Sequence, residues 1–194
     1  KGQDAILAFL VGNELSPEHV YATGTQQTES LLHAAASAVK EIDPSRLVSY
    51  ANWPQLAWLD HAMWDLIGFN VYPYYPASVA HSFGFRGYVE YLKRQMAPNR
   101  PLVVTEVGLS VSPKPGRMPG LGGLTPAQQA QQLLALWDDA FQAKAQGACI
   151  FEWHDEWWKQ GDRQGDELAH DEDDPEEWFG IMAFASADQA TPQP

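Results

Sequence analysis

The sequence predicts an α/β fold built on a parallel sheet, because short apolar runs alternate along the chain with segments of helical periodicity. The runs lack polar alternation and end at turn residues, as is typical of strands buried on both faces of a parallel sheet. In addition, neither GxGxxG nor GxxxxGK[ST] is present, so a nucleotide-binding sheet has no support. The five strands that we expect cover residues 5–13, 47–51, 66–72, 102–105 and 148–153.

Helical segments fill the intervals between these strands. The first covers residues 25–41 and stops before Pro44. A short helical stretch is expected around residues 56–63, and a third helix over residues 88–96. The fourth, over residues 125–146, has proline at its first helical position, where the missing N–H is not needed.

Length and composition are compatible with one domain. The 194 residues are 45% hydrophobic, which is enough to bury a single core, and no internal repeat or linker divides them. We expect residues 1–186 to form the domain and residues 187–194 to form a tail. The chain begins at Lys1 rather than Met and enters a strand almost at once, which suggests a piece of a longer polypeptide. The lack of a leader therefore leaves the localisation undecided.

The chain is strongly acidic. A net charge of -13 and a pI near 4.7 argue against a nucleic-acid partner and against binding to anionic membrane surfaces. No segment approaches the ~18 consecutive apolar residues of a membrane span. The single Cys149 excludes an intrachain disulfide, and its apolar surroundings predict a buried, inert thiol. We expect no cofactor and no metal, because the acidic run after Asp162 lacks the spacing of a calcium loop.

Two glutamates carry the strongest functional signal. Glu14 closes the first strand after Gly12 and Asn13, and Glu106 closes the fourth strand after Thr105. A carboxylate just past the last apolar position of a parallel strand lies at the edge where α/β folds place their chemistry. A pair of carboxylates is what glycoside hydrolysis requires, since one protonates the leaving oxygen and the other attacks the sugar or activates water. One such glutamate alone would indicate a solvated strand end, whereas the pair favours catalysis.

Four motifs in order resemble the retaining glycoside hydrolases with (β/α)₈ barrels. They are Gly12-Asn13-Glu14, Gly68-Phe69-Asn70-Val71-Tyr72, Val104-Thr105-Glu106-Val107-Gly108 and Phe151-Glu152-Trp153. The chain is similar, over roughly residues 5–185, to strands four to eight of a clan A barrel of the family two or family five kind. The resemblance implies a partial TIM barrel of about five parallel strands with outer helices, acting on a carbohydrate substrate.

The resemblance also implies a role for each matching residue. Glu14 would act as the general acid/base, and Asn13 would hold the hydroxyl next to the anomeric carbon. Glu106 would be the nucleophile, and Tyr72 would donate a hydrogen bond that keeps it ionised. Trp153 would form the floor beneath the sugar that is cleaved. Retention requires carboxyl groups ~5–5.5 Å apart, so we expect Glu14 and Glu106 to face each other at this separation.

Three further residues are candidates for substrate binding on weaker grounds. Asn70 and Trp53 lie at strand ends and can face the same cleft, although each can equally be structural. Trp157 belongs to a stretch rich in acids and aromatics directly after the fifth strand. It would either bind the outer sugars of the substrate or pack its loop against the barrel rim.

The sequence departs from the barrel pattern in what it lacks. The first three strands of the barrel have no counterpart in this chain. The arginine of the second strand, which contacts the nucleophile in the family, is therefore missing as well. Five strands left open expose two sheet edges, which favours self-association. The alternatives to hydrolysis are a non-catalytic carbohydrate-binding barrel and a transglycosylase, in which a sugar hydroxyl replaces water. The presence of both Glu14 and Glu106 argues against the non-catalytic alternative.

Overall fold

The chain forms two compact units. The computed structural model describes residues 3–116, 118, 120–156, 159, 171–184 and 192–193. Unit 1 comprises Lys1–Val71, Arg86–Thr105 and Ala140–Ala148, and unit 2 comprises Tyr72–Phe85, Glu106–Asp139 and Cys149–Pro194. Each unit is made of segments far apart in the sequence, so tertiary contacts rather than local ones hold it together.

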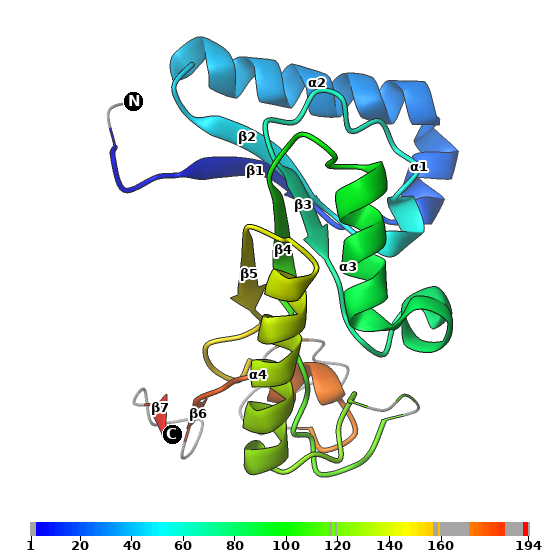
Figure 1. The fold of residues 1–194 in the computed structure, drawn as a ribbon, viewed down its shortest axis with the longest axis vertical. Coiled ribbons are helices and arrows are strands. Elements are labelled where there is room, and N and C mark those ends of the chain that lie inside the picture. The colour runs from blue at the N-terminus through cyan, green and yellow to red at the C-terminus, as the bar shows by residue number, and fades with distance from the viewer. Residues whose placement is uncertain are drawn as a thin grey trace. The chain divides into compact units, whose positions relative to one another are not determined.

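Five parallel strands form one sheet, in the order β1-β2-β3-β4-β5 (Figure 1). They are β1 (Ala8–Asn13), β2 (Leu47–Asn52), β3 (Ile67–Asn70), β4 (Leu102–Val107) and β5 (Gly147–Ile150). Since neighbouring strands run parallel, the chain must cross back between each strand and the next. A separate antiparallel pair joins β6 (Ala183–Phe184) to β7 (Pro192–Gln193).

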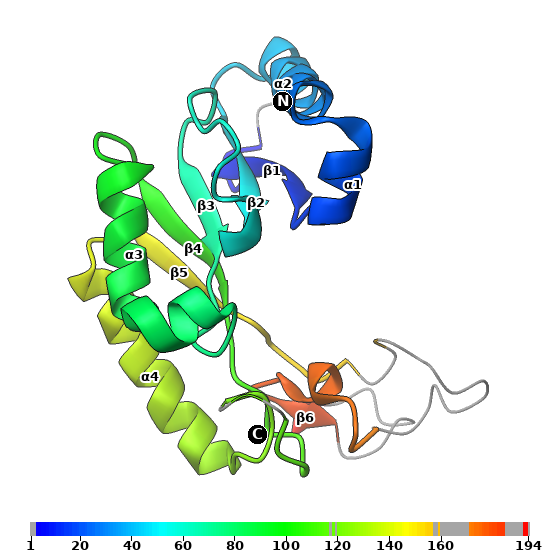
Figure 2. The same ribbon diagram turned by 90° about the vertical axis from the view of Figure 1, so that its right-hand side faces the viewer.

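The first crossover contains two helices, α1 (Pro17–Thr23) and α2 (Thr25–Ile42). The side chain of Ser16 caps α1 by accepting a hydrogen bond from the His19 N–H at 3.2 Å, and proline occupies the first helical turn. Gly24 has φ 95°, a conformation that glycine adopts without strain, and it lets the chain pass directly from α1 to α2. Figures 1 and 2 show α2 beside β1 and β2, with α1 following the end of β1.

The later crossovers contain α3 (Gly84–Gln95), which a π-helical turn at Ser78–Phe83 precedes, and α4 (Pro126–Gln142). Short 3₁₀ turns lie at Pro54–Leu56 and Pro175–Trp178. Among the residues that the structure describes, no helix is both long and apolar enough to cross a membrane.

The predicted α/β fold with five parallel strands is confirmed. The boundaries differ at the ends, since β1 begins at Ala8 rather than at residue 5 and β5 ends at Ile150. The sequence patterns did not predict α1, and the helical stretch expected over residues 56–63 is instead one 3₁₀ turn followed by a loop. Leu56 and Leu59 bury their side chains in the core from this loop, so irregular backbone suffices there.

The prediction of a buried Cys149 is wrong, because this thiol is exposed. Side chains alternate between the two faces of a strand, so Cys149 points away from the face on which Ala148 is buried. Its strand, β5, ends the order of the described five-stranded sheet. The apolar run around Cys149 identified the strand but not which of its two faces is covered.

Strand β1 is also poorly covered, whereas β2 and β3 are almost wholly buried. Leu10 is 48% exposed, and Leu7, just before the strand, is 75% exposed. Within the described sheet β1 pairs only with β2 and is therefore an edge strand. Apolar side chains on an edge strand provide a surface for association.

Candidate active site

One group of candidate residues lies in unit 1, where β1 ends at Asn13 and Glu14 follows. The strand register is irregular between Leu10 and Asn13, and Glu14 has a left-handed backbone with φ 39°. Its N–H still donates to the Ala51 carbonyl of β2 at 3.0 Å, so the turn remains attached to the sheet. Such irregularities redirect side chains at strand ends and are enriched at functional sites, at a cost of about 1–3 kcal/mol for the backbone.

Asn70, the last residue of β3, connects the two candidate site residues at the end of β1, Asn13 and Glu14. Its Nδ2 donates to Asn13 Oδ1 at 3.0 Å and to Glu14 Oε1 at 2.9 Å. Its Oδ1 accepts a hydrogen bond from the Thr105 hydroxyl at 2.6 Å. Asn70 itself is 1% exposed, so this amide is a buried positioning group and has little surface to offer a ligand.

Leu15, directly after Glu14, is held at both of its backbone polar groups. Its N–H donates to the Tyr50 hydroxyl at 2.8 Å, and its carbonyl accepts from Trp53 Nε1 at 3.0 Å. Burial raises the pKa of Tyr50, the hydrogen bond from Leu15 partly offsets the rise, and the Glu14 charge adds to it. Trp53, which could have faced the cleft, is half-buried against the cluster formed by Val20 and its neighbours. These contacts fix the backbone that carries Glu14.

A second group of candidate residues lies in unit 2, around Glu106 of β4. Tyr72 donates a hydrogen bond from its hydroxyl to Glu106 Oε2 at 2.9 Å, and this predicted contact is confirmed. Glu106 is half-buried, so the interaction is shielded from water on part of its surface. A hydroxyl donated to a carboxylate stabilises the charged form.

An aromatic cluster holds the Tyr72 ring in place. Phe179 lies edge-on to it with centroids 6.0 Å apart, Phe151 lies edge-on at 6.4 Å, and Tyr74 is tilted at 5.5 Å. These are favourable geometries for aromatic pairs. Gly108 belongs to the same packing, because a Cβ there would lie 2.0 Å from the Phe151 carbonyl oxygen. A glycine two residues after Glu106 is therefore required by close approach of two backbones.

Trp153 follows β5 and is 64% exposed, so its ring is not a core residue. The peptide bond between Phe151 and Glu152, just before it, is cis. Trp157, the other tryptophan predicted to contact substrate, lies outside the described residues.

Sequence patterns missed two acidic residues next to Trp153. Glu152 Oε1 is buried and has no hydrogen-bond partner among the described residues, and burial, with the charge of Glu156, raises its pKa to about 8. Asp155 is 1% exposed; its Oδ1 accepts the Gly180 N–H at 2.9 Å, and burial raises its pKa to about 6. Lys159 lies 4.2 Å above the Phe151 ring and neutralises part of this charge. Nothing in the local sequence distinguishes such buried acids from solvated loop acids.

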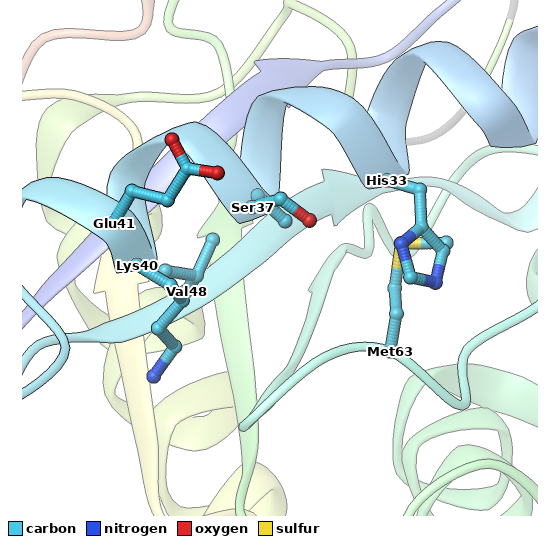
Figure 3. Close-up of a pocket in the computed structure, with 7 residues that line it drawn as sticks. His33, Ser37, Lys40, Glu41, Val48 and Met63 are labelled. Carbon is cyan, nitrogen blue, oxygen red and sulfur yellow. The ribbon is translucent and has the colours of Figure 1, made fainter.

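Within the described residues, no group of three metal-binding side chains comes together. A surface pocket of about 390 Å³ lies between α2 and the amino-terminal part of β2 (Figure 3). Its lining includes His33, Ala36, Ser37, Lys40, Glu41, Val48 and Met63. The Lys40 ammonium already binds Asp65 at 2.7 Å and the Arg46 carbonyl at 2.8 Å, so the cation in this pocket has a structural role.

The fold is similar to that of glycoside hydrolases of known structure. A GH2 β-galacturonidase from Eisenbergiella tayi, bound to glycerol, aligns with 93% of this chain at a TM-score of 0.61 and 18% identity. A β-glucuronidase from Bacteroides uniformis aligns with 92% of the chain at a TM-score of 0.57 and 18% identity. A putative β-galactosidase from Bacteroides fragilis aligns with 94% of the chain at a TM-score of 0.60 and 14% identity.

This chain spans only 30%, 20% and 25% of those three proteins, respectively. A scan against protein-family models and a search of curated proteins found no match. At this level of identity, the comparison shows that the chain shares an α/β fold with glycosidases.

Proposed function

We propose that this chain carries the catalytic residues of a retaining β-glycoside hydrolase, with Glu106 as the nucleophile and Glu14 as the general acid/base. The main support is the 2.9 Å hydrogen bond that Tyr72 donates to Glu106. A nucleophilic carboxylate must be ionised, and a donated hydroxyl favours that state. In this proposal residues 1–186 are the portion of a (β/α)₈ barrel from its fourth to its eighth strand.

In the first step, a Glu106 oxygen attacks the anomeric carbon while Glu14 donates its proton to the glycosidic oxygen. The carbon–oxygen bond breaks, the leaving group departs as an alcohol, and a glycosyl ester forms on Glu106. In the second step, the Glu14 carboxylate takes a proton from water, and that water attacks the anomeric carbon and releases Glu106. Two inversions at the same carbon leave its configuration unchanged.

The Asn70 amide orients Glu14 and Asn13 together. It donates to Glu14 Oε1 and to Asn13 Oδ1, so one buried side chain orients both groups. Asn13 is exposed beside Glu14, and in this proposal it binds the sugar hydroxyl next to the anomeric carbon. Trp153 supplies an open ring face for the sugar that is cleaved. The separation of the two carboxyl groups, ~5–5.5 Å for retention, stays a prediction.

The decisive experiment uses two variants of the full-length protein and an activated aryl β-glycoside. Glu106→Ala should abolish hydrolysis, and added azide should not restore it with retained configuration. Glu14→Ala should still form the glycosyl enzyme, because a good leaving group needs little protonation. Azide should then accelerate turnover by attacking this intermediate, which has lost the base that activates water.

The exposed Glu41 on α2 provides a control, since Glu41→Ala should behave as the unmodified protein does. The opposite azide response of the two variants would exchange the proposed roles. Full activity in both would place the chemistry elsewhere.

A further inference from the structure

Two exposed aromatic rings stack against each other in unit 1. Tyr21 on α1 is 75% exposed, and Trp58 in the loop after β2 is 47% exposed. Their centroids are 6.5 Å apart, and their planes differ by only 19°. Single exposed apolar side chains are normal on protein surfaces, but two stacked rings form one continuous apolar patch. We call Tyr21 and Trp58 the aromatic platform.

The Trp58 ring is held without being buried. Its Nε1 donates a hydrogen bond to the Gln55 carbonyl at 3.1 Å, within the same loop. The only polar group of the indole is therefore satisfied locally, and its exposed surface is the apolar ring. Exposure of this ring cannot be explained by a need to hydrate its N–H.

The residues next to the two rings are anchored in one core cluster. Val20, beside Tyr21, is 1% exposed and packs with Leu59, beside Trp58, and with Leu56. Each ring thus projects outward from a backbone whose neighbouring side chain is fully buried. A platform anchored in this way loses little conformational entropy when a ligand stacks on it.

The same cluster reaches the backbone of Glu14. Leu15 and Trp53 pack against it, and Trp53 Nε1 bonds the Leu15 carbonyl at 3.0 Å. Along the chain, α1 begins at Pro17 soon after β1, and Trp58 lies six residues after β2 and lines a surface pocket with Met96 and Arg100. Glu14 and the platform therefore belong to one packed substructure.

We propose that the aromatic platform binds a sugar ring on the leaving-group side of an uncharged, β-linked oligosaccharide. This rests on the proposed function, because Glu14 is the group that would protonate the leaving oxygen. The electron-rich faces of aromatic rings attract the weakly positive C–H groups on the apolar face of a pyranose. Because the platform would contact a second sugar ring, the natural substrate in this proposal is an oligosaccharide or polysaccharide. An aryl or methyl glycoside has no sugar in that position.

Two carboxylates next to the rings in the sequence disfavour acidic sugars, and Arg100 is a cation in the pocket beside Trp58. Glu18 lies on α1 three residues before Tyr21, Asp60 lies two residues after Trp58, and both are exposed. Carboxylates at these positions can accept hydrogen bonds from sugar hydroxyls but repel a uronate. The net charge of -13 acts in the same direction.

The test compares Trp58→Ala and Tyr21→Ala with Trp137→Ala in the full-length protein. Trp137 is a matched control because it is 39% exposed and lies on α4 in unit 2. The substrates are cellotetraose, laminaritetraose, mannotetraose and xylotetraose, each paired with the aryl β-glycoside of its own sugar. Each platform variant should lower kcat/KM for the preferred tetrasaccharide at least about fivefold while leaving aryl-glycoside hydrolysis unchanged. Trp58→Phe should retain most activity, and the control should match the unmodified protein.

Two results would overturn the platform while leaving the proposed hydrolase intact. One is an unchanged kcat/KM for the tetrasaccharide in Trp58→Ala, and the other is an equal loss with the aryl glycoside. If no glycoside is hydrolysed at all, the proposed function fails, and calorimetric titration with the same tetrasaccharides then tests the platform by itself. Binding that Trp58→Ala removes would support the platform, and a lack of binding by the unmodified protein would overturn it.

Discussion

The hydroxyl of Thr105 donates a 2.6 Å hydrogen bond to Asn70 Oδ1 and thereby sets the orientation of the Asn70 amide. With its oxygen occupied in this way, the amide presents its nitrogen to Asn13 and Glu14. A threonine of β4 thus orients a carboxyl group beyond β1 through one buried side chain of β3.

This chain of hydrogen bonds from Thr105 through Asn70 to Glu14 predicts a smaller loss of activity when Thr105 is changed than when Asn70 is changed. Thr105→Val keeps the side-chain shape but removes the donor, and we expect kcat/KM to fall about tenfold because the amide is free to turn. Asn70→Ala removes the donor to Glu14 as well and should cost about a hundredfold. The loss should be larger for glycosides with poor leaving groups, which depend most on protonation by Glu14. Equal losses for good and poor leaving groups would indicate a merely structural effect.

Tyr72→Phe isolates the hydrogen bond to Glu106. Phenylalanine keeps the ring that packs against Phe151 and Phe179 but loses the hydroxyl donor. Hydrogen bonds to charged groups contribute about 1.5–3 kcal/mol, so kcat should fall roughly 10- to 150-fold. Thermal unfolding is measured in parallel to verify that the variant is folded at the assay temperature, so that the fall in kcat is not due to unfolding. A variant with unchanged kcat would remove the main support for Glu106 as the nucleophile.

The raised pKa of Glu152 predicts that the stability of the fold depends on pH. Burial raises its pKa from 4.5 to about 8, so the folded protein keeps a proton that the unfolded chain releases above about pH 4.5. The folded state binds more protons between these values, so the free energy of unfolding decreases as the pH rises through this range. Glu152→Gln cannot ionise, and its unfolding midpoint should fall less between about pH 5 and about pH 8.

Glu41→Gln is the control for this measurement, because Glu41 is exposed and its curve should follow that of the unmodified protein. Parallel curves for Glu152→Gln and the unmodified protein would contradict the assignment of a buried, protonated carboxyl group.

Gly108→Ala tests the close approach of two backbones in unit 2. The added methyl would meet the Phe151 carbonyl oxygen at 2.0 Å and Phe179 Cδ1 at 2.8 Å, so one of the two segments must move. We expect a loss of at least about 2 kcal/mol in the free energy of unfolding, measured with urea. Gly147→Ala is the matched control, because its added methyl would lie 3.8 Å from the nearest atom. Similar stability of the two variants would show that the Gly108 contact is not tight.

The uncovered side chains of β1 predict that the 194-residue chain associates with itself. Leu7 and Leu10 are exposed near an edge strand, where unpaired backbone groups favour pairing with another chain. Leu10→Lys should reduce association in light scattering, since a charge at a sheet edge opposes such pairing. Ala22→Lys on α1 adds the same charge at an exposed site outside the sheet and should have little effect. Monodisperse unmodified chain at high concentration would contradict the prediction.

The sequence by itself determined the order of elements and the positions of the two glutamates. Apolar runs and helical periodicity are local properties, so the five strands and the long helices α2 and α4 could be predicted without any tertiary information. Glu14 and Glu106 were recognisable for the same reason, because each polar residue closes an apolar run. The contact of Tyr72 with Glu106 followed from a family resemblance, and the structure contains it.

Only the tertiary structure decided which side chains are covered and which pairs meet. Cys149 and Ala148 belong to one apolar run, yet one is exposed and one buried, because coverage depends on what packs on each face of the sheet. The pairing of Tyr21 with Trp58 joins helix α1 to the loop after β2 through a shared core, and no local pattern specifies such a contact. Likewise, Glu152 resembles any loop acid in sequence, and its raised pKa arises mainly from burial at a segment whose backbone pairs with Phe179 and Ile181. Burial and pairing are properties of packing, and packing is decided by residues far apart in the sequence.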